Sequence, residues 1–252
     1  MTKTIHYCWF GRNPLPASAK KCIESWRRHF PGYEVREWNE DNFDVNIIPY
    51  TRDAYAAGKY AFVSDYARFW ILYHHGGLYF DTDVEVIRPM YDLIANGPFM
   101  GFEKDDVKHA EKAPVIAPGL GLYAELGNSV YAEILSHFEQ MSFYLPDGTF
   151  NSYTMIPMVT ELFQKKGLVL RDEQQTVAGI TIYPNDYFNP FDDITGVLRK
   201  TPNTRSIHWY AKSWIDNNKP WLVHFKRLVR RVIGTGYLYE TIKSTIKSSK
   251  NG

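Results

Sequence analysis

Asp81 and Asp83 are the two residues of this sequence best suited to hold a metal ion. Two carboxylates at positions i and i+2 of an extended segment project to the same side, and a small hard cation such as Mn²⁺ or Mg²⁺ prefers oxygen ligands. Such a cation could neutralise a diphosphate and make it a leaving group. The spacing alone is weak evidence, because roughly one Asp-x-Asp is expected by chance in a chain of this composition.

A predicted helix and strand place these aspartates at a sheet edge. Apolar and aromatic residues recur at helical spacing from about residue 61 to 75, and Gly76-Gly77 is a strong helix stop. A buried strand then begins at Leu78, carries Asp81 and Asp83 at its carboxyl end, and is expected to continue toward Pro89. Polar residues placed there are more often functional than merely solvated.

Asp65 and Arg68 stand one helical turn apart on the helix before that strand, within a mostly apolar stretch. Taken alone, the pair also fits an ordinary ion pair on a helix surface.

The start of the chain predicts a strand at residues 5–10, a helix at 17–29 and a second strand at 33–38, an order typical of a parallel sheet with a crossover helix. Gly- and Pro-rich residues 97–130 predict loops around the mouth of the site. The remaining predicted elements are helices at 130–143 and 155–166 and strands at 179–183 and 206–209.

We divide the 252 residues into one catalytic domain, 1–218, and a basic tail, 219–252. The tail carries eight Lys or Arg against one acid, Glu240, although the whole chain has a net charge of +1. A helix at 221–233 would have one apolar and one basic face, which suits either an anionic membrane surface or docking on the core with the basic face in water.

Three blocks of the sequence, taken in order, resemble one enzyme family. Residues 61–68 (AFVSDYAR) and 76–83 (GGLYFDTD) look like the S-D-x-x-R … G-G-x-Y-x-D-x-D block of glycosyltransferases that carry the DXD sugar-binding region. Residues 5–11 (IHYCWFG) are similar to that family's I-H-x-x-W-x-G opening, and residues 38–42 (WNEDN) to its W-N-x-x-N turn. These relatives are the capsular polysaccharide and initiating α-1,6-mannosyltransferase types of glycosyltransferase family 32, distantly similar to glucosylating clostridial toxins. The C-terminal half matches only loosely.

The resemblance implies a GT-A fold, that is, a Rossmann-like mixed sheet flanked by helices. It also implies a nucleoside-diphosphate-sugar donor, most simply a UDP-sugar, and transfer with retention of anomeric configuration. Trp9 would stack on the donor base and Asn42 would help to hold the nucleoside.

The same resemblance assigns the rest of the site. Asp65 and Arg68 would contact the donor sugar, Asp81 would bridge sugar or ribose and metal, and Asp83 would be the firmest metal ligand. An indole face, a carboxylate and a guanidinium are chemically suited to such roles. The residues that would close over the diphosphate are His208, also a candidate metal ligand, with Ser213 and Trp214.

Two routes to transfer with retention of anomeric configuration remain open. Glu85 could be proposed as a covalent nucleophile, but the strand is expected simply to continue there. We favour front-face attack, in which the departing phosphate oxygen accepts the proton of the acceptor.

Two other classes of function compete with a transferase. A strand ending in Asp-Thr-Asp also resembles the first motif of haloacid-dehalogenase-type phosphatases, but that motif wants Thr or Val where this chain has Glu85. A non-enzymatic module working through the basic tail is the second alternative. The acidic balance of the rest of the chain argues against a nucleic-acid-binding surface.

The remaining expectations concern the redox state of the cysteines, the location of the protein and its acceptor. Cys8 and Cys22 are predicted to be reduced packing residues. We expect a cytoplasmic protein, either free or peripheral on the cytoplasmic face of the membrane. The acceptor would then be a saccharide or lipid-linked oligosaccharide of capsule, lipopolysaccharide or another surface glycan.

Overall fold

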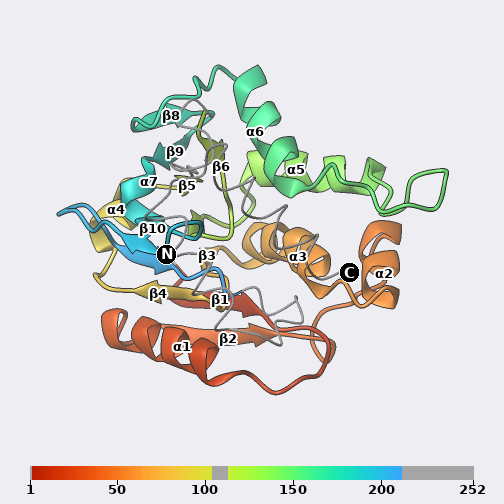
Figure 1. Cartoon of the computed structure of the whole chain (residues 1–252), viewed down its shortest axis with the longest axis horizontal. Coiled ribbons are helices and arrows are strands. Elements are labelled where there is room, and N and C mark those ends of the chain that lie inside the picture. The colour runs from red at the N-terminus through yellow and green to blue at the C-terminus, as the bar shows by residue number, and fades with distance from the viewer. Residues whose placement is uncertain (1, 104–112, 212–252) are drawn as a thin grey trace, which may run out of the picture.

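The computed structural model describes residues 2–103 and 113–211, which form a mixed α/β fold with helices on both sides of a central sheet (Figure 1). The predicted fold class, a mixed sheet flanked by helices, is therefore confirmed. Ser213, Trp214 and the tail at 219–252 lie outside the described residues. Within the described part of the chain, no helix has the length and apolar character needed to cross a membrane.

The first three elements agree with the sequence prediction. They are β1 (Thr4–Cys8), α1 (Ala17–His29) and β2 (Glu34–Trp38), and β1 pairs with β2 in parallel. Basic residues fill the last turn of α1, where they favour the negative end of the helix dipole. Figure 1 shows α1 lying along one side of these strands.

The helix that carries Asp65 and Arg68 is α3 (Tyr60–His75), which is followed by β3 (Gly77–Tyr79). The turn between them requires glycine. Gly77 has φ +99°, and a Cβ there would lie 2.6 Å from the Thr4 carbonyl oxygen. Strand β3 pairs in parallel with β1. A short helix that was not predicted, α2 (Pro49–Ala56), precedes α3 and packs against it.

The predicted continuation of the strand through Asp81 and Asp83 is wrong. Strand β3 ends at Tyr79, and a turn closes where the Val84 amide donates to the Asp81 carbonyl at 3.0 Å. The chain then leaves the central sheet, because β4 (Val84–Val86) pairs with β12 (Ser206–His208) instead. The two aspartates therefore sit in a turn and not in an extended segment.

The expectation of loops at 97–130 is wrong in part. This region contains β5 (Phe99–Glu103), β6 (Val115–Ile116) and β7 (Leu122–Ala124). These strands are short and lie among Gly and Pro residues, which hid them from the sequence pattern. The central sheet runs β2-β1-β3-β7-β5-β9-β8, in which β9 is Ile180–Tyr183 and β8 is Gln175–Val177, and β6 pairs with β5.

The remaining elements complete the two sides. Helix α5 (Ser129–Gln140) begins at Asn128, whose side chain caps it, and ends three residues before the predicted boundary because Met141 is extended. The others are α4 (Tyr91–Ala95), α6 (Met155–Lys165), β8 (Gln175–Val177), β9 (Ile180–Tyr183), α7 (Asn185–Phe188), β10 (Phe191–Asp192) and β11 (Val197–Leu198).

The sheet separates two hydrophobic cores, as strand alternation requires. Leu78 and Phe80 pack on the α1 side with Trp26, whereas Tyr79 packs with residues of α3 and α5 on the other side. Cys8 and Cys22 are buried and free, which confirms the prediction of reduced packing residues. Because both faces of β3 are packed, the chain that leaves it has a fixed exit direction.

Candidate functional site

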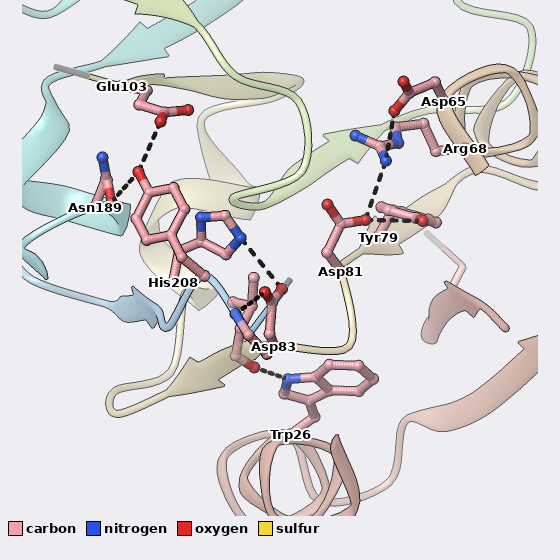
Figure 2. A network of polar contacts seen from close by, with 12 residues as sticks. Trp26, Asp65, Arg68, Tyr79, Asp81, Asp83, Glu103, Asn189 and His208 are labelled. Carbon is pink, nitrogen blue, oxygen red and sulfur yellow. Dashed lines mark hydrogen bonds and ion pairs between the residues drawn. The ribbon is translucent and has the colours of Figure 1, made fainter. Parts of the chain in front are cut away.

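The candidate site lies where β3 ends and α3 begins. Strands β1 and β3 are parallel, so their carboxyl ends share one edge of the sheet. Helix α3 leads into β3 through the glycine turn and runs back along it, so the first half of α3 reaches the same edge. This arrangement brings Asp65 and Arg68 against Asp81, as Figure 2 shows.

Arg68 joins the two acidic groups. Its Nη2 lies 3.0 Å from Asp65 Oδ1 and 3.1 Å from Asp81 Oδ1, and its Nε donates to the Ser64 carbonyl oxygen at 3.2 Å. The predicted Asp65–Arg68 pair is therefore present, but only 5% of the Arg68 side chain is exposed, so it is not an ordinary surface pair. The Arg68 guanidinium carbon also lies 5.3 Å from the centre of the Tyr79 ring.

Asp81 is held from three directions. In addition to Arg68, the Tyr79 hydroxyl donates to Asp81 Oδ1 at 3.1 Å, and the Asp81 amide donates to the Gly119 carbonyl at 3.2 Å. A Cβ built on Gly119 would lie 2.0 Å from Asp81 Oδ2. Only glycine at position 119 therefore leaves this carboxylate in its observed place.

Asp83 is held by a distant part of the chain. Its Oδ1 lies 3.2 Å from His208 Nε2, and its Oδ2 accepts from the Ala211 amide at 2.9 Å. The Asp83 carbonyl accepts from the Trp209 amide at 3.0 Å. The indole of Trp26 fixes the next residue by donating to the Val84 carbonyl at 2.7 Å. Figure 2 shows His208 and Trp26 on either side of this turn.

The pKa values of the titratable groups at the site are shifted in different directions by their surroundings. Burial raises the pKa of Asp65 to about 6, against the opposing effect of Arg68. Burial likewise raises the pKa of Asp81, although Arg68 lowers it. Burial also acts to raise the pKa of Asp83, but His208 more than offsets this and the pKa lies below its usual value. Burial acts to lower the pKa of His208, but Asp83 outweighs it and the pKa is raised.

A second layer supports His208. The rings of His208 and Tyr210 lie 4.1 Å apart, and the Tyr210 hydroxyl lies 2.7 Å from Glu103 Oε1 and 3.0 Å from Asn189 Oδ1. Tyr210 adopts φ +50°, which a residue with a side chain rarely does. The backbone strain at this position is stabilised by the hydroxyl contacts, so the position of the Tyr210 ring is set by the surrounding structure.

The donor chemistry of the turn fits a small divalent cation. Asp65, Asp81 and Asp83 supply three carboxylates, and Arg68 is the permanently charged cation that contacts two of them. Among residues 2–103 and 113–211, no three His, Cys, Asp or Glu side chains are grouped to hold an ion by themselves. Mg²⁺ in proteins is commonly held by one or two carboxylates, and water and substrate phosphates complete its coordination shell.

The other predicted donor-binding residues lie near the same edge. Trp9 follows directly after β1, is half-buried, and donates from Nε1 to the Asn13 carbonyl at 2.6 Å. Asn42 is exposed, and its amide group is used in the W-N-x-x-N turn, donating to the Glu37 carbonyl and accepting from the Asn39 amide. Within residues 2–103 and 113–211, no hydrogen bond or ion pair joins the Trp9 or Asn42 side chain to Asp81 or Asp83, and the roles of Trp9 and Asn42 toward a donor stay predictions.

Sequence reasoning missed the groups that hold the aspartates. Tyr79 carried a signal, because it stands two positions before Asp81 within the G-G-x-Y-x-D block. Gly119 lies in the loop predicted to line the site mouth, but no pattern marked it. Glu103 and Tyr210 carried no signal, since only the fold brings them to His208. Glu85, weighed as a nucleophile, accepts a hydrogen bond from Trp209 Nε1 at 2.9 Å.

Comparison with known proteins points to one enzyme family. Residues 16–100 match the model of the glycosyltransferase sugar-binding region containing the DXD motif. A curated relative, inositol phosphoceramide mannosyltransferase 1 of Schizosaccharomyces pombe, is 29% identical over 109 residues, which make up 39% of this chain and 33% of that protein. The match therefore spans about a third of the length of that relative.

Three solved structures have similar but distant folds. The PaToxG glycosyltransferase has a TM-score of 0.45 and 17% identity, over 65% of this chain and 69% of that one. The galactosyltransferase LgtC with donor and acceptor sugar analogues has a TM-score of 0.40 and 15% identity, over 73% of this chain and 74% of that one. An active-site mutant of LgtC has a TM-score of 0.40 and 14% identity, over 92% and 96%.

The family model includes every residue of the Asp65, Arg68, Asp81 and Asp83 constellation, so the resemblance seen in the sequence is confirmed for this part of the chain. The similarity to the glycosyltransferase sugar-binding region containing the DXD motif thus extends over residues 16–100.

Proposed function

We propose that this chain is a metal-dependent, retaining glycosyltransferase that moves a hexose or N-acetylhexosamine from a nucleotide sugar, in the first instance a UDP-sugar, to a saccharide acceptor. One observation carries the proposal. A DXD turn stands at the carboxyl edge of the sheet, directly against the buried Asp65–Arg68 pair, within the segment that matches the sugar-binding family model.

Each residue of the cluster has a role that suits its surroundings. Arg68 is locked between two carboxylates and can present its remaining N–H groups to sugar hydroxyls without losing side-chain freedom on binding. Asp65 accepts from the sugar, and Asp81 and Asp83 hold Mn²⁺ or Mg²⁺. When bound, the cation supplies charge that neutralises the departing diphosphate. Because the cluster is largely buried, its electrostatic interactions with a bound donor are stronger than they would be in water.

Front-face transfer agrees with the arrangement of the acidic groups. Glu85 is committed to the Trp209 indole, and Asp65 and Asp81 both share the Arg68 guanidinium. A carboxylate paired in this way is a weaker nucleophile than a free one. The proton of the acceptor hydroxyl then passes to the departing phosphate oxygen.

The name of the fungal relative suggests where the acceptor resides. That protein is named for inositol phosphoceramide, a membrane lipid. We extend this to a membrane-linked saccharide acceptor, assembled into capsule, lipopolysaccharide or another surface glycan. The enzyme would work at the cytoplasmic face of the membrane, with the basic residues 219–252 contacting anionic lipid.

Donor hydrolysis tests the proposal without knowledge of the acceptor. Full-length protein is incubated with Mn²⁺ and, in separate reactions, UDP-glucose, UDP-galactose, UDP-N-acetylglucosamine and GDP-mannose, and release of nucleotide is measured. We expect slow hydrolysis of one donor, which is abolished by chelation of the metal. Asp83→Asn should lower the rate at least about 100-fold, the scale seen when a group that stabilises transition-state charge is removed.

The matched control is Glu24→Gln, which makes the same change from carboxylate to amide at an exposed position of α1 and should leave hydrolysis unchanged. Full activity in Asp83→Asn would overturn the proposal. Phosphatase activity without hydrolysis of any nucleotide sugar would favour the dehalogenase-type alternative.

A further inference from the structure

A hollow lies between the end of α5 and helix α6, and Asp65, Arg68, Asp81 and Asp83 do not line it. It encloses about 160 Å³, and its walls mix one aromatic ring, apolar side chains and groups that form hydrogen bonds. The residues that matter for its chemistry are His137, Gln140, Tyr153, Met158, Glu161 and Lys165. We call this site the α5–α6 hollow.

Tyr153 forms an exposed aromatic wall that is nevertheless held in place. The residue is 39% exposed, yet its hydroxyl donates to Glu161 Oε2 at 2.7 Å and its amide donates to Asn151 Oδ1 at 2.9 Å. The Asn151 side chain is itself fixed by donating to the Ser142 carbonyl at 3.0 Å. A ring braced at both ends loses little freedom when a ligand stacks on it.

Three polar side chains of the hollow are uncommitted. Among the residues that the structure describes, His137, Gln140 and Lys165 have no hydrogen bond or ion pair from their side chains. They offer an imidazole, a carboxamide and an ammonium group, and Glu161 still has one free oxygen. A flat ring beside several donors and acceptors is the chemistry that recognises a sugar, since a sugar has an apolar face and a rim of hydroxyls.

The hollow adjoins the candidate active site through the start of α6. Met155, the first residue of α6, accepts from Arg68 Nη1 at 3.7 Å, while Met158, one turn further along, lines the hollow. Tyr153 stands two positions before Met155. One helical turn rises only about 5.4 Å, so the hollow lies within the reach of a short saccharide whose end is at Arg68.

We propose that the α5–α6 hollow is an acceptor subsite that binds one sugar ring of a saccharide chain, stacked on Tyr153, at a distance from the sugar that receives the transfer. The inference rests on the proposed transferase function and assigns its acceptor class as an oligosaccharide longer than a disaccharide. The volume suits a single ring, and one turn of α6 separates Met158 of the hollow from Met155, which contacts Arg68.

The mixed charge of the hollow favours a saccharide over a lipid. Tyr144, Leu145 and Phe150 are also exposed on the same connection between α5 and α6, and by themselves they would suit a membrane. The hollow, however, combines an acid with basic and amide groups. An acyl chain would leave these groups unpaired, whereas sugar hydroxyls satisfy both donors and acceptors.

Binding of the full-length protein to an array of immobilised oligosaccharides of two to eight sugars, taken from bacterial capsules and lipopolysaccharides, tests the subsite. We expect wild-type protein to retain some members of four or more sugars. Tyr153→Ala should weaken that binding about tenfold, the equivalent of one aromatic contact, and Tyr153→Phe should weaken it less because the ring remains. Leu126→Ser, an equally drastic change at an exposed residue elsewhere, should have no effect.

The outcomes separate this inference from the proposed function. Asp83→Asn should keep array binding while it loses donor hydrolysis. If wild-type protein hydrolyses a donor but array binding is absent or insensitive to Tyr153→Ala, the subsite is wrong and the transferase stands. If array binding depends on Tyr153 but no donor is hydrolysed, the transferase fails instead. Retention of wild-type protein, but not of Tyr153→Ala, on vesicles of phosphatidylcholine and phosphatidylglycerol, with no array binding, would replace the saccharide by lipid.

Discussion

The two aspartates of the turn are two positions apart, yet they are held by very different parts of the molecule. The Asp81 side is built from residues 65–81 and Gly119, is mostly buried, and joins a permanently charged guanidinium to two carboxylates. The Asp83 side is built by residues 208–211, which arrive on a strand from the far end of the described chain. The Asp81 side is part of the core, whereas the Asp83 side depends on contacts with a distant segment of the chain.

This difference predicts separate consequences for folding and for activity. Changes on the Asp81 side should lower the free energy of unfolding and the activity together, because the same contacts serve packing and ligand binding. Changes on the Asp83 side should lower activity while the fold is largely kept. Variants that break this rule would show that the two sides are more tightly coupled than their contacts indicate.

The largest loss of stability is expected from Arg68→Leu. The substitution leaves the carboxylates of Asp65 and Asp81 without their cation in a largely buried site, and removing one partner of a buried ion pair costs about 3–5 kcal/mol. Urea unfolding monitored by tryptophan fluorescence measures the loss. Arg52→Leu, which breaks an exposed pair with Asp53, should change stability by less than about 1 kcal/mol. Equal losses in the two variants would contradict a buried network.

His6 adds a pH dependence to the Asp81 side. Its Nε2 donates to the Gly76 carbonyl at 3.0 Å and its Nδ1 accepts from Trp38 Nε1 at 3.0 Å, so the ring is neutral, and burial lowers its pKa to about 4. Between pH 6.5 and 4 the unfolded chain binds the proton more readily, so this stability is complete above pH 6.5 and is lost as the pH falls toward 4.

The expected loss attributable to His6 is up to about 3 kcal/mol. Unfolding midpoints at pH 7, 5.5 and 4 measure it, and His6→Gln should remove this part of the slope, whereas His74→Gln, a change at an exposed histidine, should not. An identical pH slope in wild type and His6→Gln would show that other groups control acid unfolding.

Gly119→Ala changes the Asp81 side by adding a single methyl group. The new Cβ would meet Asp81 Oδ2 at 2.0 Å, so either the carboxylate or the loop must move. Overpacking of this kind costs about 1–3 kcal/mol, and donor hydrolysis should fall because Asp81 is displaced. Gly127→Ala adds the same methyl group where no atom lies near the new Cβ; its φ of +75° brings backbone strain that Gly119 lacks, yet donor hydrolysis should stay normal. Normal hydrolysis in Gly119→Ala would mean that the exact place of Asp81 is unimportant.

The smallest loss of stability is expected from Tyr210→Phe on the Asp83 side. The ring against His208 remains, but the hydroxyl contacts to Glu103 and Asn189 are lost, at a cost of about 1 kcal/mol. Donor hydrolysis should fall severalfold, while the free energy of unfolding falls by no more than this amount. Tyr144→Phe removes a hydroxyl from an exposed residue and should change neither quantity. A larger loss of stability in Tyr210→Phe would show that the Asp83 side is also part of the core.

The comparison also explains which features the sequence could predict. Helices α1 and α3 were predictable because their apolar periodicity and glycine stops act locally, and Asp65, Arg68, Asp81 and Asp83 stood inside recognisable blocks. The break at Tyr79 was not predictable, because it depends on β4 pairing with a strand far along the chain. Strands β5, β6 and β7 are two to five residues long and gain their stability from neighbours, so their own residues carry little signal.

The pairing of β4 with β12 bears on the order in which the candidate site is assembled during synthesis. Ser206 pairs with Val86, which precedes it by 206 − 86 = 120 positions. Chains fold progressively as they leave the ribosome, and contacts between distant segments form late because a long loop must close first. A growing chain therefore contains residues 65–81 and Gly119 well before the residues that hold Asp83 have been made. Under the proposed function, a nascent chain gains donor hydrolysis only after residues 208–211 have been translated and have positioned Asp83.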